Sequence, residues 1–161
     1  MSHLLKTQRG TRVGRPIVPS WTHVQRVTTA LPATTTDAIF TVSGGRVLVQ
    51  ALIGEVTTVI QTQACNLKVT INPTTGTSGD VAADLNISAD EVGALYLVAG
   101  DGSALDGGTA GGAFVAAGSS VTPFVVPIGT LDITTSATNT GSIKWDLWYT
   151  PLDEAAYVEA A

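Results

Sequence analysis

The segment that decides the fold reads Ser142-Ile143-Lys144-Trp145-Asp146-Leu147-Trp148-Tyr149-Thr150. Apolar side chains occupy every second position from Ile143 to Tyr149, and the positions between them are mostly polar. A period of two residues is typical of a β-strand with one face in a core. Trp148 is the exception on the polar face. Its position leaves two interpretations open, namely an exposed contact residue or a strand that is covered on both faces.

The same alternation recurs along most of the chain. Turn residues such as Gly44-Gly45 separate the alternating runs, and the spacing of roughly 8 to 12 residues is typical of antiparallel β-domains. Between them, Ser88–Glu91 predicts one turn of helix at most. The predicted strands cover residues 21–29, 38–42, 46–52, 56–62, 66–71, 81–87, 94–98, 113–117, 121–128, 131–134 and 142–150.

No sustained helical period appears, so the sequence predicts an all-β fold, an antiparallel β-sandwich with a jelly-roll-like topology. The strand order is not predicted, because alternation shows which face is buried and not which strands pair.

The first twenty residues differ from the rest. They contain Lys6, Arg9, Arg12 and Arg15 without an acid, and Gly10, Gly14, Pro16 and Pro19 interrupt any regular element. Residues 1–36 carry five cations and no acid, whereas residues 37–161 carry three cations and all thirteen acids, which gives the net charge of −5. We therefore expect an extended basic N-terminal arm over residues 1–20, a β-sandwich domain over 21–152 and a short C-terminal tail over 153–161.

The composition is poor in charge and rich in apolar residues. Charged residues make up 13% of the chain, against about a quarter in typical soluble domains, and the mean hydropathy is +0.29. No run approaches the roughly 18 apolar residues of a membrane-spanning helix. Basic residues also interrupt the region where a secretory signal would have its apolar core. We therefore expect no membrane partner and no export, and a surface that other subunits cover in part.

Few residues could carry catalysis. Cys65 is the single cysteine, so an internal disulfide is impossible, and no histidine lies near it in sequence, which favours an inert strand cysteine. His23 is interpreted as a structural or solvated strand residue, and His3 falls in the arm. No set of nucleophile, base and metal converges, so the sequence indicates no enzyme and no cofactor.

One glycine-rich loop, residues 100–112, is a candidate for binding metal or phosphate. Asp101 and Asp106 stand in a glycine-rich loop, but Gly112 occupies the position where a calcium loop needs a bidentate Glu. The run 107–112 lacks the Gly-Lys-Ser/Thr ending of a phosphate loop. The interpretation is a surface loop and no metal site.

The basic arm needs an acidic partner. Spaced arginines can contact phosphates, yet five cations over 36 residues are sparse, and Trp21 is the single aromatic residue among them. The body of the chain is acidic. The sequence therefore favours a protein partner over nucleic acid for Lys6, Arg9, Arg12 and Arg15.

The C-terminal third also carries a resemblance. It resembles the closing hairpin of small structural proteins of tailed bacteriophages, and the similarity of the Thr/Gly/Ala/Val-rich body extends over residues 40–161. The residues that carry it are Gly129-Thr130-Leu131-Asp132-Ile133-Thr134-Thr135 and Thr140-Gly141-Ser142-Ile143-Lys144-Trp145-Asp146-Leu147-Trp148-Tyr149-Thr150-Pro151-Leu152-Asp153.

This resemblance implies a virion protein, such as a capsid decoration, head-fibre or tail protein, often a homotrimer, with no catalytic residue. The expected partners are further copies of the chain and other virion proteins such as the major capsid protein. The expected location is the virion, assembled in the host cytoplasm, with Trp148 and Tyr157 as interface candidates and the arm as the anchor.

The alternative is a carbohydrate- or receptor-binding β-sandwich module. Its candidate contacts are Trp148, Tyr149, Tyr157 and the loops 74–80 and 100–112, because aromatic faces stack on sugars. Aromatic residues are 6% of the chain, which weakens this alternative.

Overall fold

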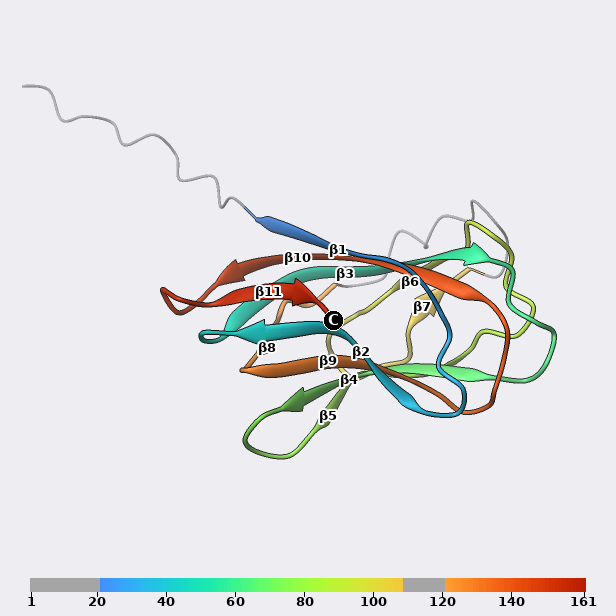
Figure 1. Ribbon diagram of the computed structural model, residues 1–161, viewed down its shortest axis with the longest axis horizontal. Coiled ribbons are helices and arrows are strands. Elements are labelled where there is room, and N and C mark those ends of the chain that lie inside the picture. Colours follow the sequence, from blue (N-terminus) through green and yellow to red (C-terminus); the bar gives the residue numbers. More distant parts are fainter. Residues whose placement is uncertain (1–20, 109–120) are drawn as a thin grey trace, which may run out of the picture.

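The computed structural model describes residues 21–108 and 121–161 (Figure 1). No helix occurs in these two ranges, so the predicted all-β class is confirmed. The strands are β1 (Thr22–Ala30), β2 (Thr36–Ser43), β3 (Val47–Thr58), β4 (Asn66–Pro73), β5 (Gly79–Asn86), β6 (Leu95–Leu97), β7 (Asp106–Gly107), β8 (Phe124–Val126), β9 (Gly129–Thr135), β10 (Ser142–Pro151) and β11 (Tyr157–Ala160).

The strands form two sheets, in which every strand pairing is antiparallel. The first sheet has the order β1-β10-β3-β6-β7, with β8 also paired to β3. The second sheet has the order β11-β2-β9-β4-β5. Figure 1 shows the two sheets as layers, with β10 and β3 in one and β9 and β4 in the other.

A single apolar core joins the two sheets. Trp145 and Leu52 of the first sheet and Phe40 and Leu131 of the second are fully buried in it. The alternation predicted for β10 is confirmed, because its residues switch between buried and half-buried along most of its length. The core therefore lies on one face of each sheet and leaves the two outer faces for contacts.

The structure replaces two predicted strands, 46–52 and 56–62, with the single strand β3 of 12 residues. Gly54 is the reason for the wrong prediction, since an isolated glycine in a strand pattern suggests a break. In the structure Gly54 faces the ring of Trp145, and a Cβ atom there would lie 2.9 Å from Trp145 Cζ3. The glycine is thus a packing residue that lets a tryptophan lie flat against β3.

The predicted helical turn at Ser88–Glu91 is not formed. Ala89 has φ of +66°, a left-handed conformation that a right-handed helix excludes. Its backbone N–H donates to Gln61 O over 3.1 Å. The segment is a tight connection between β5 and β6, and this hydrogen bond holds it against the residues that follow β3.

Residues 157–160, placed in the tail by the sequence, form β11 on the edge of β2. Val158 pairs with Val42 and is 5% exposed. Four residues are too few for alternation to be visible in the sequence. The predicted arm, residues 1–20, and the predicted strand 113–117 lie outside the described residues, so both stay predictions.

Candidate assembly surface and polar groove

One long side of the two-sheet body consists of edge strands. β1 ends the first sheet and β11 ends the second. The two strands contact each other across the gap between the sheets, as Figure 1 also shows. An edge strand presents a row of backbone N–H and C=O groups that another chain can pair with. We call this side, residues 21–30 and 157–160, the β1/β11 edge.

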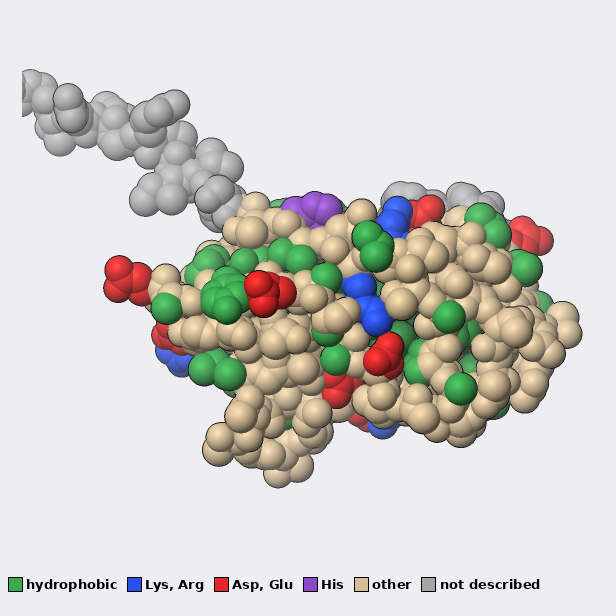
Figure 2. Space-filling model, in the orientation of Figure 1, with side chains coloured by type: hydrophobic (Ala, Val, Ile, Leu, Met, Phe, Trp, Pro, Cys, Tyr) green, Lys and Arg blue, Asp and Glu red, His purple; other side chains and the backbone are tan. Residues whose placement is uncertain are grey.

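Large apolar side chains are exposed at this edge. Trp21 is 56% exposed, Val27 is 71% exposed and Tyr157 is 46% exposed. Figure 2 shows the same side of the molecule, with hydrophobic side chains (green) at the surface between separate acidic and basic ones. Single exposed apolar residues are ordinary, but a group of them beside an edge strand is typical of a protein contact.

The buried side chain of Arg26 connects the strands at the β1/β11 edge. Its side chain is 8% exposed, and its Nη2 atom lies 3.1 Å from Asp37 Oδ2. Its Nε atom donates to Ala161 O over 3.3 Å, and Nη1 donates to the Thr29 hydroxyl. In the sequence, Arg26 is one of the five cations of residues 1–36. In the structure its guanidinium connects β1, β2 and Ala161, so Arg26 stabilises the conformation of the edge.

Trp148, one of the two predicted interface residues, lies half-buried on the outer face of the first sheet. The ring of His23 stacks on it with centroids 4.7 Å apart and an interplanar angle of 23°. His23 Nε2 also lies 2.7 Å from Asp146 Oδ1, to which Gln25 Nε2 donates over 2.8 Å. Trp148 is therefore a cross-strand packing residue with part of its ring left for contact.

Tyr157, the second predicted interface residue, is exposed on the other sheet, so the structure does not bring it together with Trp148. Tyr149 was a candidate sugar contact, and that prediction is wrong. Tyr149 is 4% exposed, and its hydroxyl accepts the N–H of Val158 over 3.3 Å. Lys6, Arg9, Arg12 and Arg15 lie outside the described residues.

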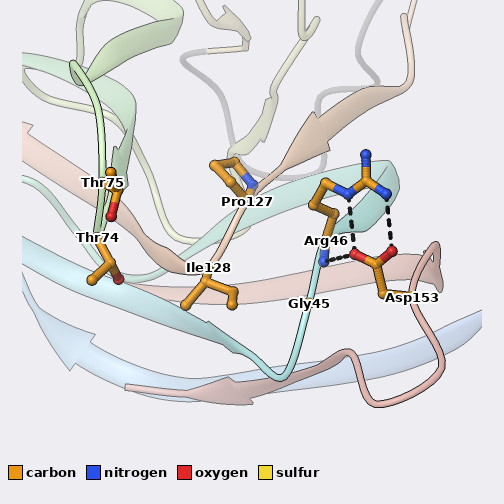
Figure 3. A pocket seen from close by; sticks show the side chains of 7 residues that line it. All are labelled: Gly45, Arg46, Thr74, Thr75, Pro127, Ile128 and Asp153. Atoms are coloured by element: carbon orange, nitrogen blue, oxygen red, sulfur yellow. Dashed lines mark hydrogen bonds and ion pairs between the residues drawn. The ribbon is translucent and has the colours of Figure 1, made fainter.

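A pocket of about 350 Å³ opens at one end of the body, between four turns (Figure 3). Pro127 and Ile128 give it an apolar wall, and Arg46 and Asp153 close one side. Arg46 donates to Asp153 through Nε (3.0 Å), Nη2 (2.9 Å) and its backbone N–H (2.7 Å). These bonds lower the pKa of Asp153 to about 2, and the side-chain bonds from Arg46 contribute most. The charges of this pocket already satisfy each other, so it offers little to a charged ligand.

A second hollow, of about 440 Å³, lies on the outer face of the second sheet, and we call it the sheet groove. Asp132 and Thr134 point into it from β9, since they alternate with the core residues Leu131 and Ile133. Its lining is polar throughout, consisting of Thr36, Lys68, Thr70, Asn72, Ser78, Asp132 and Thr134.

An ion pair forms one wall of the sheet groove. Lys68 Nζ lies 3.2 Å from both carboxyl oxygens of Asp80, and the Thr70 hydroxyl donates to Asp80 Oδ1 over 2.7 Å. The Thr70 bond, more than the lysine, lowers the pKa of Asp80. On the opposite wall the hydroxyls of Thr36 and Thr134 are 2.8 Å apart. Because its carboxyl group already pairs with Lys68 and Thr70, Asp80 is a structural residue of the groove wall.

Asp132 differs from the other polar residues of the groove. It is 5% exposed, and its Oδ1 atom is buried without a hydrogen-bond partner among the described residues. A buried polar atom without a partner costs free energy. No sequence pattern distinguishes Asp132 from a surface residue, because it occupies an ordinary polar position in an alternating strand.

The loop 74–80, a candidate glycan contact, contributes to both hollows. Thr74 lines the end pocket, and Ser78 lines the sheet groove.

The structure also places the residues that the sequence offers for metal binding and for thiol chemistry. No group of three or more His, Cys, Asp or Glu side chains in them could hold a metal ion. Asp101, considered for calcium, accepts the Ser103 backbone N–H over 2.9 Å and the Ser103 hydroxyl over 2.5 Å through the same Oδ1 atom. Cys65 is 1% exposed, as expected for a buried thiol. Residues 21–108 and 121–161 also hold no helix of the length and apolarity needed to cross a bilayer.

Comparison with known proteins gives no match to a family model, to a curated protein or to a solved structure.

Proposed function

We propose that this chain is a structural subunit of a bacteriophage virion that associates with copies of itself through the β1/β11 edge and anchors to the particle through its N-terminal arm. Its partners are further copies, as a homotrimer, and a virion protein such as the major capsid protein. The exposed apolar residues on the edge strands carry this proposal, since they offer both backbone pairing groups and apolar contact area.

The strand order supports a jelly-roll β-sandwich as the architecture. A jelly roll has eight strands in two sheets and is found in viral capsid and lectin domains. Here β1-β10-β3-β6 and β2-β9-β4-β5 alternate between the sheets along the chain. In each sheet the early and late strands interleave, as they do when a long hairpin ribbon rolls up. β7, β8 and β11 are additions to this eight-strand arrangement.

The carbohydrate- or receptor-binding module is the weaker alternative. A sugar-binding face needs an aromatic ring that is free to stack, yet Tyr149 is buried and His23 covers part of Trp148. The sheet groove has no aromatic ring among its described lining residues.

The substitution Val27→Lys tests the edge. Val27 is 71% exposed, so a lysine there is accommodated in the single chain and repels an apolar partner surface. Val59→Lys is the matched control, because Val59 is 55% exposed and lies in the turn after β3, outside the edge. We expect Val27→Lys to lower the native mass of the purified chain while its circular dichroism spectrum stays that of the folded protein, and we expect Val59→Lys to keep both the wild-type mass and the wild-type thermal midpoint. An unchanged mass for a folded Val27→Lys protein would overturn the edge as the contact.

The virion assignment has its own test. Particles sedimented from producing cells and banded on a density gradient should contain the full chain, detected by mass spectrometry. A full chain with Lys6, Arg9, Arg12 and Arg15 all replaced by Gln should fold and be missing from the band. Equal incorporation of this variant would refute the anchoring role, and absence of the wild-type chain from the band would refute the virion assignment.

A further inference from the structure

The sheet groove has the features of a ligand-binding site. It lies on the outer face of a sheet, its described lining is wholly polar, and Asp132 stands in it with one carboxyl oxygen buried and unpartnered. Such an oxygen is explained by strain, by a water or an ion, or by a donor from a binding partner. Because the groove is open on the outer face of the sheet, a donor group from outside can reach the carboxyl group of Asp132.

Formal charge favours a cationic donor. Lys68 and Asp80 cancel each other in the groove wall, so Asp132 leaves the groove with a formal charge of −1. An arginine guanidinium is the side chain best matched to a carboxyl group, because its planar fork donates two parallel hydrogen bonds. The threonine hydroxyls around Asp132 can accept the remaining N–H groups of the fork.

The chain itself supplies such a group. Residues 1–20 carry Lys6, Arg9, Arg12 and Arg15 and no acid, a formal charge of +4, whereas residues 21–161 carry four cations and thirteen acids, a formal charge of −9. Arg15 is six residues and Lys6 fifteen residues before Trp21, so a fully extended chain places them at most about 20 Å and about 50 Å from the start of β1. A segment of that length can contact any surface of a second copy that lies within about 50 Å of the start of β1.

We propose that the basic arm of one copy binds in the sheet groove of a second copy, where an arginine guanidinium donates hydrogen bonds to Asp132. This inference rests on the proposed function, since binding between copies links subunits and binding within one chain does not. The β1/β11 edge then makes the apolar contact between copies, and the arm and groove make the polar one. The arm anchors its own copy to the particle by binding a copy that is already part of that particle.

Disulfide trapping between two different full-length chains tests this contact. Both chains carry Cys65→Ser, so that each has a single introduced thiol. One carries Thr11→Cys, which keeps all four arm cations, and the other carries Thr36→Cys in the groove wall. The control partner carries Thr58→Cys, an exposed position at the end of β3 in the opposite sheet and outside the β1/β11 edge. Under mild oxidation we expect a mixed dimer with Thr36→Cys that forms about tenfold faster than the one with Thr58→Cys.

Adding Asp132→Asn to the Thr36→Cys chain should slow trapping about tenfold, because the substitution keeps the shape and removes the charge. Asp84→Asn, the same change at an exposed acid of β5 outside the groove lining, should slow it less than twofold. Equal effects of the two substitutions would overturn the role of Asp132.

Two further outcomes would also overturn the proposal. Equal rates for Thr36→Cys and Thr58→Cys would show that the arm does not select the groove. A disulfide that forms within a chain carrying both Thr11→Cys and Thr36→Cys, but not between chains, would place the arm in its own groove. An oligomeric native mass combined with either outcome would leave the proposed self-association standing, whereas a monomeric mass would remove that function itself.

Discussion

The Tyr96 hydroxyl donates to Asp90 Oδ2 over 2.6 Å inside the core, where Tyr96 is 0% and Asp90 is 3% exposed. Burial, and then this bond, raises the pKa of Tyr96. Burial also raises the pKa of Asp90, although the tyrosine bond opposes that shift. The pair is therefore a buried polar contact whose cost depends on pH.

Removing the hydroxyl with Tyr96→Phe should destabilise the fold by about 1–3 kcal/mol, because it leaves a buried carboxyl oxygen without its donor. Urea unfolding followed by tryptophan fluorescence measures the change. Thr58→Val, which removes an exposed hydroxyl at the end of β3 and outside the β1/β11 edge, is the control and should leave the unfolding midpoint unchanged.

Asp90→Asn should change how stability depends on pH. A carboxyl group whose pKa is raised in the folded state keeps its proton after the unfolded chain has lost it, so its contribution falls as pH rises from about 3.8 through the folded pKa. An asparagine has no proton to lose, so its contribution to stability does not fall over this range. We expect the urea midpoint of the variant, relative to that of wild type, to rise between pH 3 and pH 7. A difference that does not vary with pH would contradict the raised pKa.

Asp153 behaves in the opposite sense. Its pKa falls from 3.8 to about 2, first through the side-chain bonds from Arg46, so the pair's contribution is complete above pH 3.8 and disappears as pH falls to about 2. Asp153→Asn should lose this acid-dependent part of the unfolding midpoint. Glu154→Gln, the same loss of one charge at the next residue, should keep it.

The burial and the contacts of individual residues are the features that the sequence predicts least well. The buried thiol of Cys65 followed from residue type alone. Arg26 and Asp132 look like surface residues in the sequence, yet both are buried. The strands that lie beside them come from distant parts of the chain, β10 for Arg26 and β2 and β4 for Asp132. The stacking of His23 on Trp148 depends on the register of β1 against β10, which alternation does not encode.

At the scale of elements, the sequence predicts strands well where they are long and alternate, as in β10 and β4. It fails where a strand is too short for a period to show, as in β11, or where a glycine has a packing role, as in β3. The groove and the edge follow from strand order, which only long-range pairing determines.

The two glycines Gly54 and Gly79 give a matched prediction for β3 and β5. A Cβ atom at Gly54 would lie 2.9 Å from the buried ring of Trp145, whereas one at Gly79 would have no atom within 4 Å. Gly54→Ala should therefore destabilise the fold by about 1–3 kcal/mol through overpacking. Gly79→Ala should be neutral or stabilise it by up to about 1 kcal/mol through the entropy of the unfolded chain. Urea unfolding of both variants checks this, and equal effects would contradict the packing role of Gly54.

At the scale of the whole molecule, charge and surface point the same way. The acidic body, the basic N-terminal segment and the exposed apolar residues of the edge are the features that the proposed association of copies would satisfy. Composition alone indicated that part of the surface is covered. The structure adds where such a contact can form, namely at the β1/β11 edge and the sheet groove.

The native mass of the full-length chain, measured by light scattering over a concentration series, tests self-association most directly. The account predicts a stable mass near three times the chain mass of 16.5 kDa, and a lower mass for Val27→Lys. A mass of 16.5 kDa at every concentration would contradict the proposal that the chain is a self-associating subunit.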